Sequence, residues 1–114
     1  MVLVVVDDDP LSLAAMKDHF GSLGLLNKAY FFGSPIAFEA FLVSANRDEL
    51  FVFSDFDLKA EINGLGLIAR HQLEHQAALV TACTKERIQE ETKGHGIPVY
   101  NKKDLGALKI EMVG

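Results

Sequence analysis

The stretch that decides the fold runs from Val2 to Pro10 and reads Val2-Leu3-Val4-Val5-Val6-Asp7-Asp8-Asp9-Pro10. Its first five residues are aliphatic, without polar alternation, which is typical of a strand buried on both faces of a parallel sheet. Asp9 and Pro10 then form a helix start, because aspartate caps free backbone N–H groups and proline fits the first helical turn. We therefore predict a strand over 2–6 and a helix over about 10–22.

The same alternation of an apolar run and a helical pattern recurs along the chain. Further strands are predicted over 28–32, 50–54, 77–80 and 97–100. Helices are predicted from Pro35, over 64–74, from Thr84 to Lys93, and from Asp104 onward. Parallel strands joined by right-handed crossovers give an α/β fold, an open sheet with helices on both faces.

Length and composition indicate one ordinary globular domain spanning residues 1–114. Apolar residues make up 49% of the chain and charged residues 24%, so a disordered or fibrous class is excluded. Cys83 is the single cysteine and cannot form an internal disulfide, which fits a reducing compartment.

The charge of the chain argues against two classes of partner. A formal net charge of -5 gives no field that would attract nucleic acid, so direct nucleic acid binding is not expected. The longest apolar stretch has six residues, far below the roughly 20 that cross a bilayer. With no signal-peptide pattern at the start, we expect no membrane association and a cytoplasmic location.

Polar side chains follow four of the five predicted strands, namely Asp7 with Asp8, Asp55, Thr81 and Lys102. Singly, such residues are also typical of turns and solvated surfaces, so their joint placement carries the prediction. Ligands of open parallel sheets bind at the carboxyl ends of the strands. Three carboxylates gathered there repel one another unless a cation lies among them, and oxygen ligation suits Mg²⁺. Together these groups are the parts needed for phosphoryl transfer onto aspartate.

The order and spacing of four segments resemble the response-regulator receiver domain: Val4-Val5-Val6-Asp7-Asp8-Asp9-Pro10, Phe53-Ser54-Asp55-Phe56-Asp57-Leu58, Val80-Thr81-Ala82 and Lys102. The resemblance covers essentially the whole chain. It implies a flavodoxin-like (βα)5 doubly wound parallel sheet with strand order 2-1-3-4-5. It also implies that a sensor histidine kinase or a histidine phosphotransfer protein donates a phosphoryl group from phosphohistidine.

The resemblance also implies a role for each site residue. Asp55 matches the phosphoacceptor. Asp8 would bind Mg²⁺ directly, Asp7 would bind it through water or as a second ligand, and the backbone carbonyl of Asp57 would complete the protein ligands. Such a domain catalyses its own phosphorylation and dephosphorylation but is not an enzyme that turns over a substrate.

Lys102 and Thr81 match the residues that respond to the phosphoryl group. Lys102 would pair with the phosphoryl oxygens. Thr81 would move to hydrogen-bond them and would shift the face built by the fourth helix, the fifth strand and the fifth helix. That face would carry the signal to a downstream protein or to a fused output domain.

Three features depart from the family pattern. Lys59 stands where proline usually follows the acceptor, and Gly64 lies one position later than is commonest. Lys103 replaces the usual proline after the motif lysine, where a cis bond before a non-proline residue would cost about 2.5–4 kcal/mol, which leaves the loop geometry there open. Val99 occupies the switch-aromatic position and Tyr100 comes one residue late, so aromatic gating of the output face is expected to be absent or altered.

Two alternatives stay open at this point. Asp55 and Asp57 also read as the Asp-x-Asp pair of a haloacid-dehalogenase-like phosphatase, although the acidic pair Asp7 and Asp8 comes first in the chain, where that family places its metal-binding acids late. A degenerate receiver that acts only as an interaction module is the second alternative. The sequence does not distinguish a stand-alone regulator from a piece of a larger protein such as a hybrid kinase.

Overall fold

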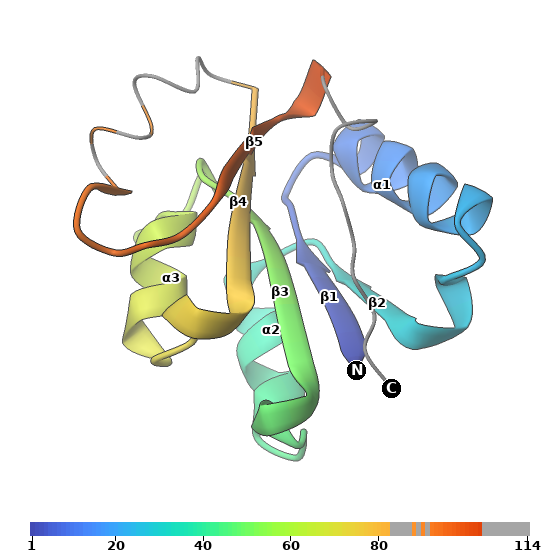
Figure 1. The fold of residues 1–114 in the computed structure, drawn as a ribbon, viewed down its shortest axis with the longest axis horizontal. Helices are drawn as coiled ribbons and strands as arrows, with labels where there is room; N and C mark the ends of the chain where they lie inside the picture. The colour runs from blue at the N-terminus through green and yellow to red at the C-terminus, as the bar shows by residue number, and fades with distance from the viewer. Residues whose placement is uncertain (83–87, 89, 91, 104–114) are drawn as a thin grey trace.

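The computed structural model describes residues 1–82, 88, 90 and 92–103. A parallel five-stranded sheet with the order β2-β1-β3-β4-β5 forms its centre, as Figure 1 shows. The strands are β1 (Val2–Val6), β2 (Ala29–Phe32), β3 (Leu50–Asp55), β4 (Ala77–Thr81) and β5 (Val99–Asn101). The described helices are α1 (Pro10–Ser22), α2 (Pro35–Leu42) and α3 (Gly64–Arg70). The predicted α/β fold with strand order 2-1-3-4-5 is confirmed.

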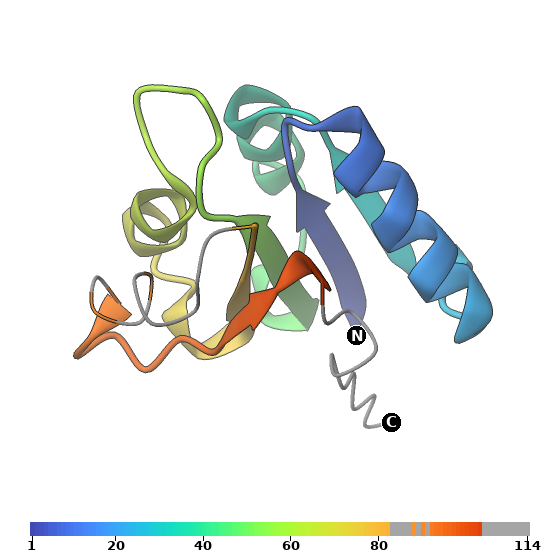
Figure 2. The same cartoon turned by 90° about the horizontal axis from the view of Figure 1, so that it is seen from above.

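The core lies in two layers, one on each face of the sheet. Alternate residues of β1 point to opposite layers, because successive side chains of a strand face opposite ways. Val4 and Val6 pack on the side of α2 and α3, whereas Leu3 and Val5 pack on the side of α1. Figure 2 shows the sheet from above, with α1 apart from α2 and α3. These four side chains are at most 2% exposed and Val2 is partly buried, so the strand is buried on both faces as predicted.

Helix α1 begins and ends where the sequence predicts. The Asp9 side chain accepts a hydrogen bond from the backbone N–H of Leu11 at 3.1 Å, and Pro10 occupies the first turn. At the other end Gly24 adopts a φ of 72°, and the N–H of Leu25 donates to the carbonyl of Phe20 at 2.9 Å. This left-handed cap is the usual way in which a glycine ends a helix.

Helix α3 ends four residues before the predicted boundary at residue 74. Gln72 adopts a φ of 57°, and the N–H of Leu73 donates to the carbonyl of Ile68 at 3.0 Å. This is the same left-handed cap as in α1, made without glycine. The prediction of a helix over 64–74 was therefore wrong at its end, because the sequence offered no glycine or proline to mark the stop.

Strand β5 begins at Val99 and not at Ile97 as predicted. Proline has no N–H for the ladder, so Pro98 contributes only its carbonyl, which accepts from the N–H of Leu79 at 2.9 Å. Of the predicted helix over 84–93 the structure describes only residues 88, 90, 92 and 93. The predicted helix from Asp104 and the cysteine at position 83 lie outside the described residues.

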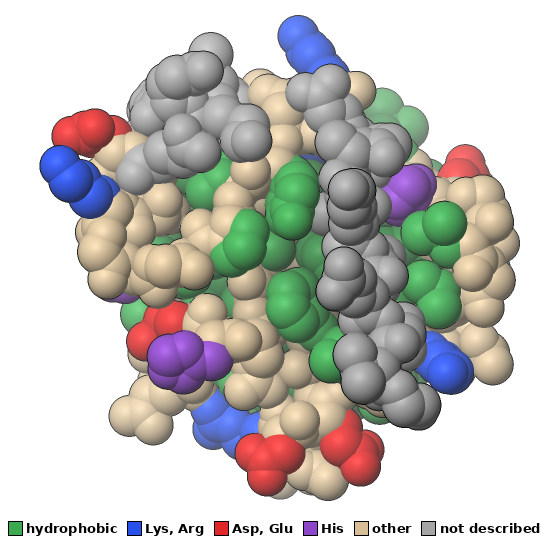
Figure 3. Space-filling view, in the orientation of Figure 1, with side chains coloured by type: hydrophobic (Ala, Val, Ile, Leu, Met, Phe, Trp, Pro, Cys, Tyr) green, Lys and Arg blue, Asp and Glu red, His purple; other side chains and the backbone are tan. Residues whose placement is uncertain are grey.

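The surface seen in the orientation of Figure 1 is mixed in character. Hydrophobic side chains gather over the middle of the sheet, and acidic and basic side chains are interspersed around the rim (Figure 3). Among the residues that the structure describes, no helix combines the length and the apolar character needed to cross a membrane.

Candidate acidic site at the carboxyl edge of the sheet

The carboxyl ends of β1 and β3 bring three acidic side chains together. Val6 of β1 lies beside Ser54 of β3 in the ladder, so the residues that follow them, Asp7 and Asp55, meet at the same edge. Asp7, Asp8 and Asp55 each offer one carboxylate oxygen, and these oxygens lie within 4.8 Å of one another. The structure thus assembles the three acids that the sequence analysis placed together.

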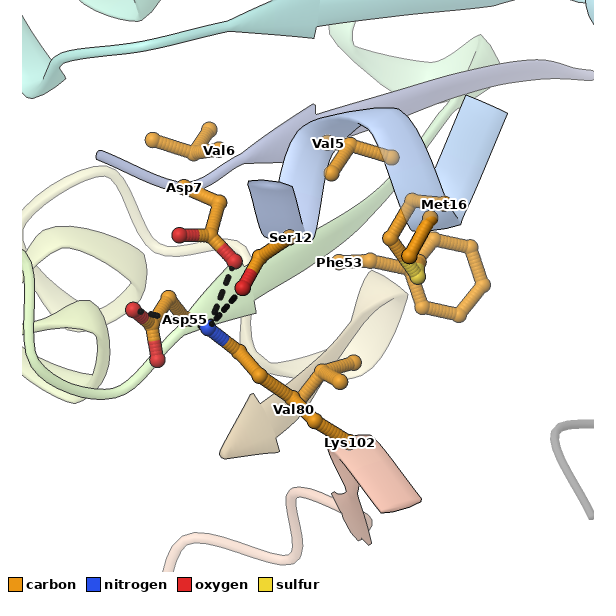
Figure 4. A pocket seen from close by; sticks show the side chains of 10 residues that line it. Val5, Val6, Asp7, Ser12, Met16, Phe53, Asp55, Val80 and Lys102 are labelled. Atoms are coloured by element: carbon orange, nitrogen blue, oxygen red, sulfur yellow. Dashed lines mark hydrogen bonds and ion pairs between the residues drawn. The ribbon is translucent and has the colours of Figure 1, made fainter. Parts of the chain in front are cut away.

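Lys102 reaches this group from the end of β5. Its Nζ lies 2.8 Å from Oδ2 of Asp7 and 3.3 Å from Oδ2 of Asp55. Figure 4 shows the ammonium between the two carboxylates, with the aliphatic stem of the lysine running back toward β5. One positive charge is therefore already fixed between two of the three acids.

Burial changes the acid-base properties of Asp55 and Lys102. Asp55 is 8% exposed, and this burial together with the charge of Asp7 raises its pKa to about 7, although Lys102 opposes the shift. Burial alone lowers the pKa of Lys102, but its hydrogen bond to Asp7 and the charges of Asp55 and Asp7 outweigh this effect, so its pKa is raised. Lys102 therefore stays charged, and Asp55 titrates near neutral pH unless a further cation stabilises its ionised form.

Thr81 and Asp57 lie at the same edge of the sheet. Thr81 ends β4 and is 1% exposed, whereas Asp57 is exposed and its side chain accepts from the N–H of Lys59 at 3.1 Å. Both line a hollow of about 180 Å³, which is bounded by Asp8, Asp9, Asp55, Asp57, Lys59, Thr81, Ala82 and Lys102. Five of the six predicted site residues therefore line one hollow, and the sixth, Asp7, contacts Lys102 at its wall.

Gly64 has a part in the site that the sequence analysis did not assign. A Cβ at this position would collide with the backbone carbonyl oxygen of Asp55 and would come within 2.8 Å of Ser54 Oγ. Ser54 Oγ donates to that same carbonyl at 2.9 Å. Helix α3 can therefore start against the end of β3 only because residue 64 is glycine. The glycine was visible in the sequence, but nothing there revealed this contact.

Lys59 is a second cation at the mouth of the hollow. Its φ of 48° is left-handed, a conformation that side chains other than glycine rarely adopt. The side chain is exposed and its charge lowers the pKa of Asp9, although the largest cause of that lowering is the hydrogen bond from Leu11. From the sequence alone, Lys59 stands out only as a departure from the receiver pattern, with no part in the site.

The described segment around Lys102 has no cis peptide bond, and Lys102 contacts Asp7 and Asp55. No cis peptide bond occurs within the described part of the chain, and the bond between Lys102 and Lys103 is part of it. The N–H of Lys103 donates to the side chain of Asn101 at 2.8 Å. Val99 is 5% exposed, and Tyr100 packs against the core layer on the α1 side.

The donor set fits a hard divalent cation. All three carboxylates offer oxygen, and oxygen is the ligand that hard divalent cations such as Mg²⁺ prefer. The residues that would hold such an ion are Asp7, Asp8 and Asp55.

The strand order and the acidic edge together define a flavodoxin-like doubly wound α/β protein with its polar site at the carboxyl ends of the strands. The more specific likeness comes from solved structures. A response regulator receiver protein from Dyadobacter fermentans matches with a TM-score of 0.72 and 20% identity, over 96% of this chain and 89% of that chain. The signal receiver domain of an HD domain-containing protein from Pseudomonas fluorescens matches with a TM-score of 0.66 and 20% identity, over 89% of this chain and 74% of that chain.

The chain therefore has the fold of a response regulator receiver domain, as the sequence resemblance implied. No model of a protein family matches the sequence, and no curated protein does either.

Proposed function

We propose that this chain is a phosphoacceptor receiver domain in which Asp55 accepts a phosphoryl group from phosphohistidine. The observation that carries the proposal is the arrangement of a buried aspartate beside two further acids and a lysine at the carboxyl edge of a receiver-like sheet. The fold likeness to a response regulator receiver protein supports the same assignment.

The transfer step exchanges one bond to phosphorus for another. An oxygen of ionised Asp55 forms a bond to phosphorus while the P–N bond of the donor breaks, and the electron pair of that bond goes to the imidazole nitrogen. Lys102 stabilises the ionised form of Asp55 before attack and can pair with a phosphoryl oxygen afterward. Water later attacks the acyl phosphate, which releases phosphate and restores the carboxylate.

Asp7 and Asp8, with Asp55 and the backbone carbonyl of Asp57, would hold Mg²⁺. The bound ion would supply the positive charge that offsets the carboxylates and the phosphoryl oxygens during transfer. Without it, burial and then the neighbouring charge of Asp7 disfavour the ionised form of Asp55 and raise its pKa.

The readout of phosphorylation would be a change in protein contacts. Thr81 lines the hollow, and a move of its hydroxyl toward the phosphoryl group would alter the surface near β4 and β5. The partners would be a sensor histidine kinase or histidine phosphotransfer protein upstream, and a target protein or a fused output domain downstream. We place the domain in the cytoplasm, as a signalling module and not a turnover enzyme.

The test is incubation with acetyl phosphate and Mg²⁺, followed by intact-protein mass spectrometry. The wild-type chain is expected to gain one phosphoryl mass, and Asp55→Asn or EDTA should abolish the gain. Asp57→Asn is the matched control, because the exposed side chain of Asp57 borders the same hollow and the substitution keeps the backbone carbonyl that would bind Mg²⁺. A wild-type chain that gains no mass would favour the degenerate interaction module. Multiple turnover of a phosphoester that is lost in Asp57→Asn would favour the phosphatase.

A further inference from the structure

The Lys102 ammonium has a third partner beyond the two carboxylates. Nζ donates to Oγ of Ser12 at 2.9 Å, although the two residues are 90 positions apart in the chain. Ser12 belongs to the first turn of α1, and Figure 4 shows its hydroxyl beside Asp7 at the tip of the lysine. The proposed transfer step assigns no part to this serine.

The neighbours of Ser12 fix the direction of its hydroxyl. Oγ donates its single hydrogen to Oδ2 of Asp9 at 3.0 Å, so a lone pair is left to face Lys102. Asp9 is itself immobilised, since its other oxygen accepts from the N–H of Leu11. The serine is therefore oriented as an acceptor for the ammonium before any phosphoryl group arrives.

These contacts close into a ring of four residues. The N–H of Asp9 donates to Oδ1 of Asp7 at 2.9 Å, and Oδ2 of Asp7 lies 2.8 Å from Nζ of Lys102. The ring thus runs from Asp7 through Asp9 and Ser12 to Lys102 and back to Asp7. An ammonium has three N–H donors, and the longest of its three contacts here, at 3.3 Å, is the one to Asp55.

We propose that Ser12 is a positioning residue that, with Asp7, holds the Lys102 ammonium so that only its contact to Asp55 is exchanged during the phosphorylation cycle. The proposal rests on the proposed function for its chemical consequence. When Asp55 becomes an acyl phosphate, the N–H that faced its carboxylate turns to a phosphoryl oxygen. The other two N–H groups stay on Ser12 and Asp7, so the ammonium need not be repositioned.

The kinetic test is a double-mutant cycle on the rate of phosphorylation by acetyl phosphate with Mg²⁺. Ser12→Ala is expected to slow the reaction roughly five- to tenfold, the size of one ordinary hydrogen bond. Ser12→Thr keeps the hydroxyl and should retain most of the wild-type rate. In a Lys102→Met background Ser12→Ala should cause no further loss. Ser22→Ala is the control on the same helix, because the hydroxyl of Ser22 donates to the carbonyl of His19 at the far end, away from Lys102.

A second readout does not depend on phosphorylation. The ¹⁵N signal of the Lys102 ammonium, assigned by its loss in Lys102→Met, should show slower proton exchange in the wild type and Ser12→Thr than in Ser12→Ala. An unchanged exchange rate in Ser12→Ala, or an equal kinetic loss in both lysine backgrounds, would overturn the positioning role. A wild-type chain that takes up no phosphoryl group but shows the Ser12-dependent exchange would reject the proposed function and keep the positioning role.

Discussion

Val6 and Asp7 are neighbours in the chain and are buried to nearly the same extent, at 0% and 3% exposure, but burial affects them in opposite ways. The valine gains free energy when its methyl groups leave water. The aspartate loses hydration that its partners must replace. Strand β3 shows the same contrast: burial is favourable for Phe53, which is 3% exposed, and unfavourable for Asp55, which is 8% exposed.

Burial of the apolar interior lowers the free energy of the fold, whereas burial of the acids at the carboxyl edge raises it. The interior is held by apolar contacts on both faces of the sheet. The edge is held by directed contacts, above all those of Lys102 with Asp7 and Asp55. We infer that removing an interior side chain weakens the fold, whereas neutralising Asp55 strengthens it and abolishes the proposed phosphoryl transfer.

The largest effect is expected from Phe20→Ala in the interior. Phe20 is fully buried, and its ring lies 5.9 Å from that of Phe31 and 5.7 Å from that of Phe53. Truncation should lower the free energy of unfolding by about 3–5 kcal/mol. Urea unfolding followed by circular dichroism measures it. Leu11→Ala is the control on the same helix, because Leu11 is 80% exposed and its loss should change stability by less than about 0.5 kcal/mol.

Gly64→Ala tests the boundary between the interior and the edge. The added methyl group must displace the carbonyl of Asp55, so a loss of about 3 kcal/mol in unfolding free energy is expected, together with slower phosphorylation. Gly33→Ala is the matched control, since the nearest atom to its added Cβ is a side-chain carbon of Leu13 at 4.0 Å. Equal stability of the two variants would show that the close approach at Gly64 does not constrain the edge.

Asp55→Asn is expected to stabilise the fold in EDTA at pH 8. The pKa of Asp55 is raised to about 7 by burial and by Asp7, so the folded state keeps a proton that the unfolded state releases above about pH 4. The stability linked to that proton is fully present below about pH 4 and is lost as the pH rises through about 7. The asparagine variant should therefore exceed the wild type by on the order of 2 kcal/mol at pH 8.

The measurement is urea unfolding of both proteins at pH 5 and pH 8. The prediction would be contradicted if Asp55→Asn were no more stable than the wild type at pH 8, or if its advantage in unfolding free energy were larger at pH 5 than at pH 8. Added Mg²⁺ should raise the stability of the wild type at pH 8 by binding the folded state, and should raise that of Asp55→Asn less. Equal stabilisation of both would argue against Asp55 as a ligand.

The smallest effect is expected at an ion pair away from the edge, between α2 and the end of α3. Oε2 of Glu39 lies 2.6 Å from Nε2 of His71 and 3.5 Å from Arg70, and the hydrogen bond with His71 lowers the pKa of Glu39. This contribution is present above the ordinary carboxyl pKa of 4.5 and is lost as the pH falls through the lowered value. Glu39→Gln should cost about 0.5 kcal/mol at pH 7, and less in high salt. A cost that does not shrink in high salt would rule out an ionic origin.

The sequence predicted the parts of the fold that local signals determine. The apolar run of β1 and the Asp9-Pro10 helix start gave the correct bounds of the first strand and of α1. The acids at the strand ends were placed together because the carboxyl ends of parallel strands meet at one edge.

The remainder depended on contacts between distant segments. The left-handed cap at Gln72 has no residue signature, so the end of α3 was misplaced. The contact of Gly64 with the Asp55 carbonyl and the bond from Lys102 to Ser12 join segments whose packing a single sequence does not reveal. The roles assigned to Asp7, Asp8, Asp55, Asp57, Thr81 and Lys102 stay predictions until the phosphorylation experiment is done.

A hydrogen bond between its two ends closes the loop that joins β3 to α3. The N–H of Gly64 donates to the carbonyl of Phe56 at 2.7 Å. This hydrogen bond holds the two ends of the loop that carries Asp57 and Lys59 next to each other. The entropy of closing such a loop grows only slowly with its length. Residues can therefore be added or removed at its exposed tip while the strand and the helix on either side stay in register. This tip is the natural place to graft a fluorescent or affinity tag that reports on the site from outside.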